Sequence, residues 1–234
     1  MNEEDGPVSE RHAKALARRR LKQALAAIYD PPPAVLLPDR DALCDYVRAT
    51  LGDAPLTYLE FGVKGGRSFK RIAERFTHAD ARFIGFDSFE GLPEDWLFQP
   101  QGRFSTGGKP PDLRDPRMRF VTGWFQNALP GFLNENDIGG AAPLLVHYDA
   151  DLYGSTLFVL AELWRHADDY YFLFDEFFQE EAVALYDFSR AFPVEIEFLA
   201  QTTTTPFKQV FGRMRRVEFK PRRAIEEKPC DASS

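Results

Sequence analysis

The sequence of 234 residues predicts an α/β fold: a doubly wound, mostly parallel, seven-stranded sheet with an N-terminal helical extension. Strand-like and helix-like segments alternate through most of the chain beyond residue 55. Several predicted strands are almost continuous apolar runs, as expected of parallel strands that are covered on both faces. Right-handed crossovers between such strands place a ligand crevice at their carboxyl ends.

The bulk composition is that of a globular protein. Hydrophobic residues make up 44% of the chain and charged residues 28%, which excludes global disorder. The 36 acidic and 29 basic residues give a net charge of −7, which argues against a general nucleic-acid-binding protein. The 22 phenylalanines could fill a thick core or line an aromatic pocket, and composition does not decide between the two.

The cysteines and the N-terminus bear on the compartment. Cys44 and Cys230 form neither a disulfide framework nor a zinc motif, which indicates a reducing environment. The first residues are acidic and polar, unlike a secretory signal, and no apolar run approaches the ~20 residues needed to cross a bilayer. We therefore expect a cytoplasmic protein that binds neither nucleic acid nor membrane.

Residues 10–54 are predicted to form a helical cap that follows a disordered tail at residues 1–9. Apolar residues recur at helical spacing within 11–29, and prolines at 31–33 end this helix. Its run of three arginines, residues 18–20, could contact nucleic acid or form the solvated face of an amphipathic helix. A second helix is predicted at residues 39–51.

Residues 55–222 are predicted to form the main domain, and residues 223–234 a polar tail. The predicted strands cover residues 56–62, 82–87, 119–122, 143–149, 170–176, 195–200 and 209–219. The predicted helices cover residues 68–76, 155–166 and 180–191. Residues 99–115 are rich in Gly, Pro and Lys and are predicted to be a mobile loop, either a lid or a plain surface insertion.

A glycine-rich turn follows the first strand of the main domain, where residues 60–68 read EFGVKGGRS. Glycines let the backbone approach a ligand closely, and the helix that follows offers free N–H groups. The dinucleotide fingerprint G-x-G-x-x-G would need glycine at the position of Lys64, which weakens an NAD interpretation. Asp87 ends the next strand and could bind ribose hydroxyls or cap the following turn. Together the turn and Asp87 predict an adenosine-type ligand.

Three motifs in this order resemble the macrocin O-methyltransferase family (the TylF/MycF type), a branch of the class I S-adenosylmethionine (SAM) methyltransferases. They are EFGV at residues 60–63 with Gly66 and Ser68, GFDSFEGLP at residues 85–93, and HYDADLYGST at residues 147–156. The resemblance covers about residues 56–200. It implies a Rossmann-like SAM-binding domain at residues 55–222, with the N-terminal helices as a cap over the active site.

The resemblance also implies roles for individual residues. The glycine-rich turn would hold the methionine portion of SAM, Asp87 would bind the ribose, and Phe125 with its two predecessors would form a wall of the adenine pocket. The implied cofactor-binding residues are Glu60, Phe61, Gly62, Gly66, Ser68, Asp87, Ser88, Phe89, Gly123 and Trp124.

Acidic residues end two neighbouring apolar strands and predict a divalent metal site. Asp149, Asp175 and Glu176 would repel one another unless a cation joined them, and magnesium prefers such oxygen ligands. The alternatives are helix caps or salt-bridge partners. The resemblance implies magnesium, which would lower the pKa of an acceptor hydroxyl before it attacks the SAM methyl group.

Asp149, Asp151 and His147 are the candidate catalytic residues, since they flank one another at the end of a strand. His147 could equally be a buried, hydrogen-bonded histidine. Family members that act on antibiotic sugars have a proposed histidine base nearer the C-terminus, but no histidine follows His166 in this chain. The base is therefore open, and so is a sugar as substrate.

The sequence thus predicts a Mg-assisted, SAM-dependent O-methyltransferase that acts on a hydroxyl of a small molecule, such as a sugar or glycosylated natural product. An NAD-type oxidoreductase and a non-catalytic SAM-binding protein on the same fold are the alternatives. Relatives often pair through N-terminal segments, which makes a homodimer an option. A basic run between Arg213 and Arg223 could bind an anionic substrate or protect a strand edge.

Overall fold

The computed structural model describes residues 10–28, 32–33, 35–140, 142–177, 180–203 and 208–218. The predicted tails at residues 1–9 and 223–234, and Cys230 with them, lie outside the described residues. In the part of the chain that is described, no helix is both long and apolar enough to cross a membrane.

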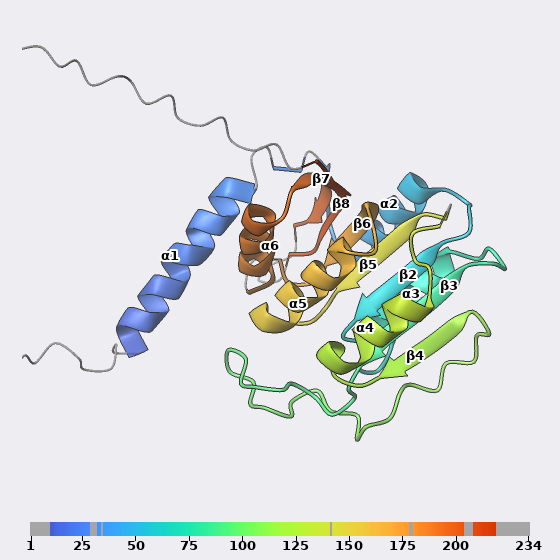
Figure 1. Cartoon of the computed structure of the whole chain (residues 1–234), viewed down its shortest axis with the longest axis horizontal. Helices are drawn as coiled ribbons and strands as arrows, with labels where there is room; N and C mark the ends of the chain where they lie inside the picture. Colours follow the sequence, from blue (N-terminus) through green and yellow to red (C-terminus); the bar gives the residue numbers. More distant parts are fainter. Residues whose placement is uncertain are drawn as a thin grey trace, which may run out of the picture.

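The described strands form an eight-stranded sheet that is the middle layer of the molecule (Figure 1). The strands are β1 (Val35–Leu37), β2 (Thr57–Phe61), β3 (Arg82–Asp87), β4 (Met118–Thr122), β5 (Leu144–Tyr148), β6 (Asp169–Phe174), β7 (Val194–Thr202) and β8 (Val210–Arg216). Their order across the sheet is β1-β7-β8-β6-β5-β2-β3-β4. All neighbours are parallel, except that β8 is antiparallel to both β6 and β7. The predicted doubly wound, mostly parallel α/β fold is confirmed.

The sheet has one strand more than the predicted seven. This strand, β1, lies within the predicted helical cap and pairs with β7. Three residues are too few to show the alternation of apolar and polar side chains that identifies a strand, so no pattern predicts this one.

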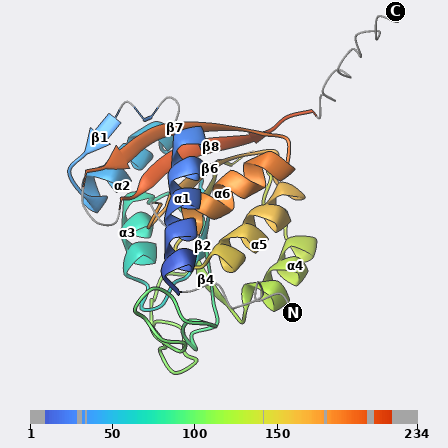
Figure 2. The ribbon, with the colours of Figure 1, turned by 90° about the vertical axis from the view of Figure 1, so that its left-hand side faces the viewer.

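Helices cover both faces of the sheet (Figures 1 and 2). They are α1 (Glu10–Ile28), α2 (Arg40–Leu51), α3 (Arg67–Arg75), α4 (Phe125–Glu135), α5 (Tyr153–Trp164) and α6 (Glu180–Ala191). The buried side chains of α2 and α3 pack in one apolar core, and those of α4, α5 and α6 pack in another on the opposite face. The result is a three-layer α/β/α arrangement.

The N-terminal helix α1 lies against α6, outside the three layers (Figure 2). Leu21, Leu25 and Ile28 pack on the core beneath α6, whereas Arg18 and Arg19 are exposed. Arg20 pairs with Asp187 of α6. The arginine run therefore belongs to the solvated face of an amphipathic helix, the second of the two interpretations.

Helix α4 was not predicted. Pro130 and Gly131 lie inside it, and both residue types normally interrupt helices. The helix forms because Leu129, Phe132 and Leu133 are buried against the sheet, so tertiary packing outweighs the local preference.

The chain path creates a switch point in the middle of the sheet. From β2 it continues to β3 and β4 on one side, then returns to β5 and β6 on the other. Adjacent strands β2 and β5 thus lead in opposite directions across the sheet, and a crevice opens beyond their carboxyl ends. This is where the predicted site residues lie.

Candidate functional site

An aromatic ladder, called the aromatic floor below, crosses four strands one residue before the crevice, in the core that packs against α4, α5 and α6. The last aromatic residues of four neighbouring strands, Phe86, Phe61, Tyr148 and Phe174, are in register and fully buried. In this order, each ring stacks on the next, with centroids 4.8, 6.3 and 4.5 Å apart. Such contacts add to the stabilisation from burial alone. The register aligns the residues just after the ladder, so that Gly62, Asp87, Asp149 and Asp175 meet along one edge.

The glycine turn after β2 approaches the loop after β5 very closely. Gly62 has φ +98°, and a Cβ atom there would lie 1.8 Å from the Asp149 carbonyl oxygen. Only glycine fits this position. Two residues on, Lys64 adopts φ +51°, a conformation that costs a side-chain-bearing residue roughly 1 kcal/mol.

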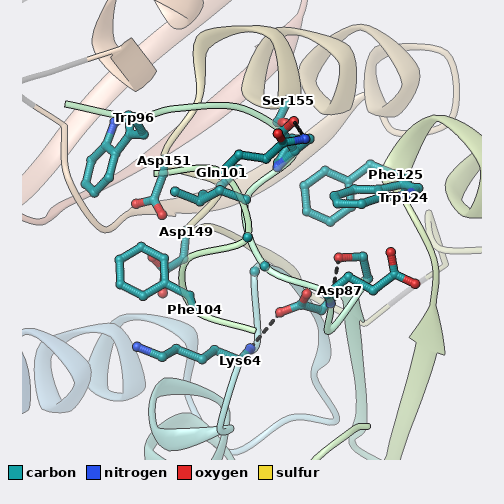
Figure 3. Close-up of a pocket in the computed structure, with 18 of the residues that line it drawn as sticks. Lys64, Asp87, Trp96, Gln101, Phe104, Trp124, Phe125, Asp149, Asp151 and Ser155 are labelled. Atoms are coloured by element: carbon teal, nitrogen blue, oxygen red, sulfur yellow. Dashed lines mark hydrogen bonds between the residues drawn. The ribbon is translucent and has the colours of Figure 1, made fainter. Parts of the chain in front are cut away.

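Asp87 holds this turn in place. Its Oδ2 accepts the backbone N–H groups of Val63 (2.9 Å) and Lys64 (2.7 Å), and its Oδ1 accepts that of Phe89 (2.7 Å). Figure 3 shows the bond to Lys64. The capping role is therefore present. Asp87 also lines the crevice, so a ligand can reach its carboxylate.

The crevice is an open cleft of about 960 Å³. Trp124 and Phe125 lie together on one side, and Trp96, Phe104 and the acids Asp149 and Asp151 lie on the other (Figure 3). Five of the predicted cofactor residues line it, namely Gly62, Asp87, Ser88, Gly123 and Trp124. Arg40, in the first turn of α2 and thus within the predicted cap, also lines the cleft.

Five other predicted cofactor residues lie outside the described lining: Glu60, Phe61, Gly66, Ser68 and Phe89. Phe61 is part of the aromatic floor, and Phe89 packs edge-on against Phe120. Glu60 is fully buried and accepts hydrogen bonds from Ser68 (2.7 Å) and from Tyr58. Their direct contact with a ligand stays a prediction.

The predicted loop at residues 99–115 is part of a hydrogen-bonded wall. The Leu92 N–H donates to the Arg103 carbonyl oxygen, and the Gly102 N–H donates to the Leu92 carbonyl oxygen, each at 2.9 Å. Phe104 packs on Trp96 at 6.5 Å between centroids, and the Lys64 Nζ lies 4.3 Å from the Phe104 ring centroid. Gln101, Gly102 and Phe104 of this segment line the cleft, and its role as a lid stays a prediction.

Backbone strain gathers around this cleft. The described non-glycine residues with positive φ are Lys64, Phe89, Leu97, Phe104 and Asp151. Lys64, Phe104 and Asp151 line the cleft, and Phe89 and Leu97 each follow a lining residue in the sequence, Ser88 and Trp96. Strained conformations of this kind persist where the surroundings impose them, and they cluster at functional sites.

The acids at the strand ends do not titrate alike. Burial and the neighbouring Asp175 raise the pKa of Asp149 well above its usual value. Burial, with the charge of Asp175, raises the pKa of Asp151 to about 7. Burial, with the charges of Asp151 and Asp175, raises the pKa of Glu176 to about 8. For Asp175, burial acts upward, but His147, Arg40 and Gln209 outweigh it and lower the pKa.

His147 lies beneath the cleft in a buried polar network. Its Nδ1 lies 2.8 Å from the Tyr58 hydroxyl and 3.4 Å from Glu60, and its Nε2 lies 3.6 Å from the Asp175 Oδ1. Burial favours the neutral ring, but Asp175 and Glu60 outweigh it and raise the pKa to about 10. His147 therefore matches the alternative of a buried, hydrogen-bonded histidine, and its catalytic role stays a prediction.

The predicted metal ligands do not fit a metal ion. Asp175 Oδ2 accepts a hydrogen bond from Arg40 (2.7 Å), and its Oδ1 accepts one from Gln209 Nε2. Each Asp175 oxygen therefore already has one protein donor. Among the described residues, no three His, Cys, Asp or Glu side chains gather closely enough to hold a metal ion. The salt-bridge alternative describes Asp175 better.

Glu181 holds two loops of the candidate site together and was not among the predicted residues. It is 1% exposed, and its two oxygens accept the backbone N–H groups of Ala150 and Glu176, both at 3.2 Å. It thereby joins the loops after β5 and β6, which carry the cleft acids. An acid in the first turn of a helix reads as an ordinary cap, so its sequence position carried no distinct signal.

The basic run near the C-terminus is paired with acids. Arg213 bonds to Asp169 (2.6 Å), and Arg215 lies 3.4 Å from Glu197. These residues belong to β8, which lies between β6 and β7 and is not a sheet edge. The predicted protection of a strand edge is therefore wrong. Lys220, Arg222 and Arg223 lie outside the described residues.

No protein-family model matches the sequence, and no curated protein matches it. Solved structures do resemble the fold. The O-methyltransferase NovP is 19% identical with a TM-score of 0.49, over 88% of this chain and 100% of NovP. The O-methyltransferase TomG of Streptomyces achromogenes, involved in tomaymycin synthesis and solved with SAM, is 15% identical with a TM-score of 0.46, over 85% and 90%. CmcI, solved with magnesium and SAM, is 18% identical with a TM-score of 0.45, over 77% and 72%.

Proposed function

We propose that the protein is a SAM-dependent O-methyltransferase that methylates a hydroxyl group of a small molecule. One observation carries the proposal: a cleft at the switch point of the sheet combines a glycine turn anchored by Asp87 with aromatic walls and a row of acids. The first two features suit an adenosine-type ligand, and the acids suit proton removal from a hydroxyl.

The cofactor end of the cleft has the donors and acceptors that SAM needs. A carboxylate offers about four acceptor sites, and three of those on Asp87 are filled by backbone N–H groups. One site is left for a ribose hydroxyl, and the carboxylate of Glu90 lines the same cleft. Trp124 and Phe125 offer aromatic surface to the adenine.

Asp151 is the residue that would take the acceptor proton. It lines the cleft beside Asp149 (Figure 3), and its pKa of about 7 suits a general base at neutral pH. Bound SAM supplies a methyl group on a positively charged sulfur. Asp151 removes the hydroxyl proton as the oxygen bonds to that methyl carbon and the carbon–sulfur bond breaks. The walls contribute by aligning the two reactants.

The alternatives are weaker. Lys64 stands where a dinucleotide site needs glycine, which disfavours an NAD-type oxidoreductase. A non-catalytic SAM-binding protein would not need an aligned base in the cleft. The family resemblance implies a magnesium ion, but the hydrogen bonds of Asp175 argue against one.

Thermal unfolding with SAM, its demethylated product S-adenosylhomocysteine (SAH) and NAD, each with and without magnesium, tests the proposal. SAM and SAH should each raise the melting temperature, and NAD should not. Stabilisation by NAD alone would refute the methyltransferase assignment. Methyl transfer from labelled SAM to a panel of phenols, catechols and sugars then tests the chemistry.

A variant pair separates catalysis from binding. Asp151→Asn should abolish methyl transfer but keep SAH binding. Asp112→Asn, at an exposed position paired with Arg114, is the matched control and should keep both. Full turnover in Asp151→Asn would remove Asp151 as the base.

A further inference from the structure

Arg40 places a fixed positive charge at the acid edge of the cleft. Its Nη2 lies 2.7 Å from the Asp175 Oδ2, and the Asp175 side chain is only 5% exposed. The position is set locally, because the Asp39 side chain accepts the Ala42 N–H (2.9 Å) and so fixes the start of α2. A cation in the first turn opposes the helix dipole, so the contact with Asp175 must offset that cost.

The charge of Arg40 acts on Glu176 as well as on Asp175. It lowers the pKa of Asp175, and it opposes the upward shift of Glu176. Among the described residues, Lys64 also lines the cleft. Its Nζ lies over the Phe104 ring. Among the described lysines and arginines that line the cleft, Arg40 is thus the one in direct contact with an acid of the edge.

A metal ion would compete with Arg40 for the same oxygen. Magnesium needs carboxylate oxygens at about 2.0–2.1 Å in near-octahedral geometry. The Asp175 oxygens already accept hydrogen bonds from Arg40 and Gln209. A metal ion on the same oxygen as Arg40 would place two cations side by side, and their repulsion would weaken metal binding.

Arg40 also has donors to spare. A guanidinium has five N–H groups, and the described residues show one of them bonded, to Asp175. The side chain is 43% exposed and lines the cleft, so the remaining donors can meet a ligand. Guanidinium groups bind paired oxygens well and remain protonated at all physiological pH values.

We propose that Arg40 takes the place of the catalytic metal: it neutralises Asp175 and donates hydrogen bonds to the acceptor oxygen as negative charge develops there. This inference rests on the proposed methyltransferase function. In the reaction, the acceptor O–H proton passes to Asp151, the oxygen–carbon bond forms, and the carbon–sulfur bond breaks to leave neutral SAH. Arg40 stays charged throughout. An acceptor with two neighbouring oxygens, such as a catechol or vicinal diol, fits its remaining donors.

Binding of Mn²⁺ alone, followed by electron paramagnetic resonance in the presence of SAH, tests the proposal without an acceptor. The wild-type protein should show no saturable binding up to about 1 mM metal. Arg40→Ala should bind Mn²⁺ at least about tenfold more tightly, because the acids lose their cation. Arg40→Lys keeps the charge and should behave as the wild type. Arg48→Met, on the same helix but bonded to the Arg75 carbonyl, is the matched control.

The outcomes are distinct. Tight Mn²⁺ binding by the wild type, or no gain in Arg40→Ala, would overturn the proposal. Absence of SAH binding in the wild type would instead overturn the proposed function. With an acceptor in hand, turnover after EDTA treatment should be unchanged, and Arg40→Ala should lose about 100-fold in kcat. Turnover that requires added metal would also overturn the proposal.

Discussion

Replacement of Asp87 by asparagine tests the central contact of the cleft. The side chain accepts three backbone N–H groups, two on Oδ2 and one on Oδ1, at 2.7–2.9 Å. Hydrogen bonds to a charged acceptor contribute about 1.5–3 kcal/mol, and those to a neutral one about 1 kcal/mol. An amide can keep the two bonds on one oxygen, both weakened, and loses the third. Each weakened bond loses about 0.5–2 kcal/mol and the lost bond about 1.5–3, so we expect Asp87→Asn to cost at least about 2.5 kcal/mol of folding free energy.

Urea unfolding measures this cost, and SAH titration measures the effect on binding. The affinity should fall at least about tenfold, because the turn loosens and a ribose acceptor is lost. Asp95→Asn is the matched control: Asp95 also accepts a backbone N–H within the cleft wall, that of Gln101 at 2.8 Å, but only one. Its cost should stay below about 1 kcal/mol. A change below about 0.5 kcal/mol in Asp87→Asn would refute the anchoring role.

Three further predictions concern the same edge. Gly62→Ala should cost more than about 4 kcal/mol in urea unfolding, since positive φ and a 1.8 Å approach to a backbone oxygen cannot both be relieved. Glu181→Ala should cost about 2–3 kcal/mol by the same assay and slow turnover, since it strips the acceptors from the buried N–H groups of Ala150 and Glu176. Burial raises the pKa of Asp151 to about 7 and that of Glu176 to about 8, so the native state keeps protons that the unfolded chain releases from about pH 4. These carboxyls should therefore add stability at low pH that is lost as the pH rises through 7 to 8, measured as melting temperature against pH.

Each of these has a contrary result. A Gly62→Ala protein that unfolds at the wild-type urea concentration would show that the turn can relax. Unchanged stability in Glu181→Ala would mean that water replaces the carboxyl. For the pH profile, Glu176→Gln should flatten the upper part of the curve, and a slope equal to that of the wild type would assign it to other groups.

The sequence predicted the strand ends of the site well. Asp87, Asp149 and Asp175 each follow an apolar run, and the parallel register aligns them along one edge. Composition along the chain is enough to find such positions, because strand ends are local features.

Side-chain direction was harder to predict. Glu60 and Phe61 adjoin the glycine turn, yet they alternate across β2, one into the polar network and the other into the aromatic floor. Proximity in sequence to a ligand-binding turn therefore does not place a side chain in the cleft. Arg40 was missed for the opposite reason: it lies 135 positions from Asp175, and no local pattern links the two.

The position of β8 has a consequence for how the chain can fold. This strand is the last one described, yet it lies between β6 and β7, and β1 from near the N-terminus joins the sheet only through β7. During synthesis the early part of the chain emerges first. The β2–β6 block can assemble then, but β1 and β7 must wait until residues 210–216 are available to bridge them. A truncation before Val210 would therefore divide the sheet in its interior and leave β1 and β7 as a separate pair. The unpaired edges of β6 and β7 would then favour aggregation.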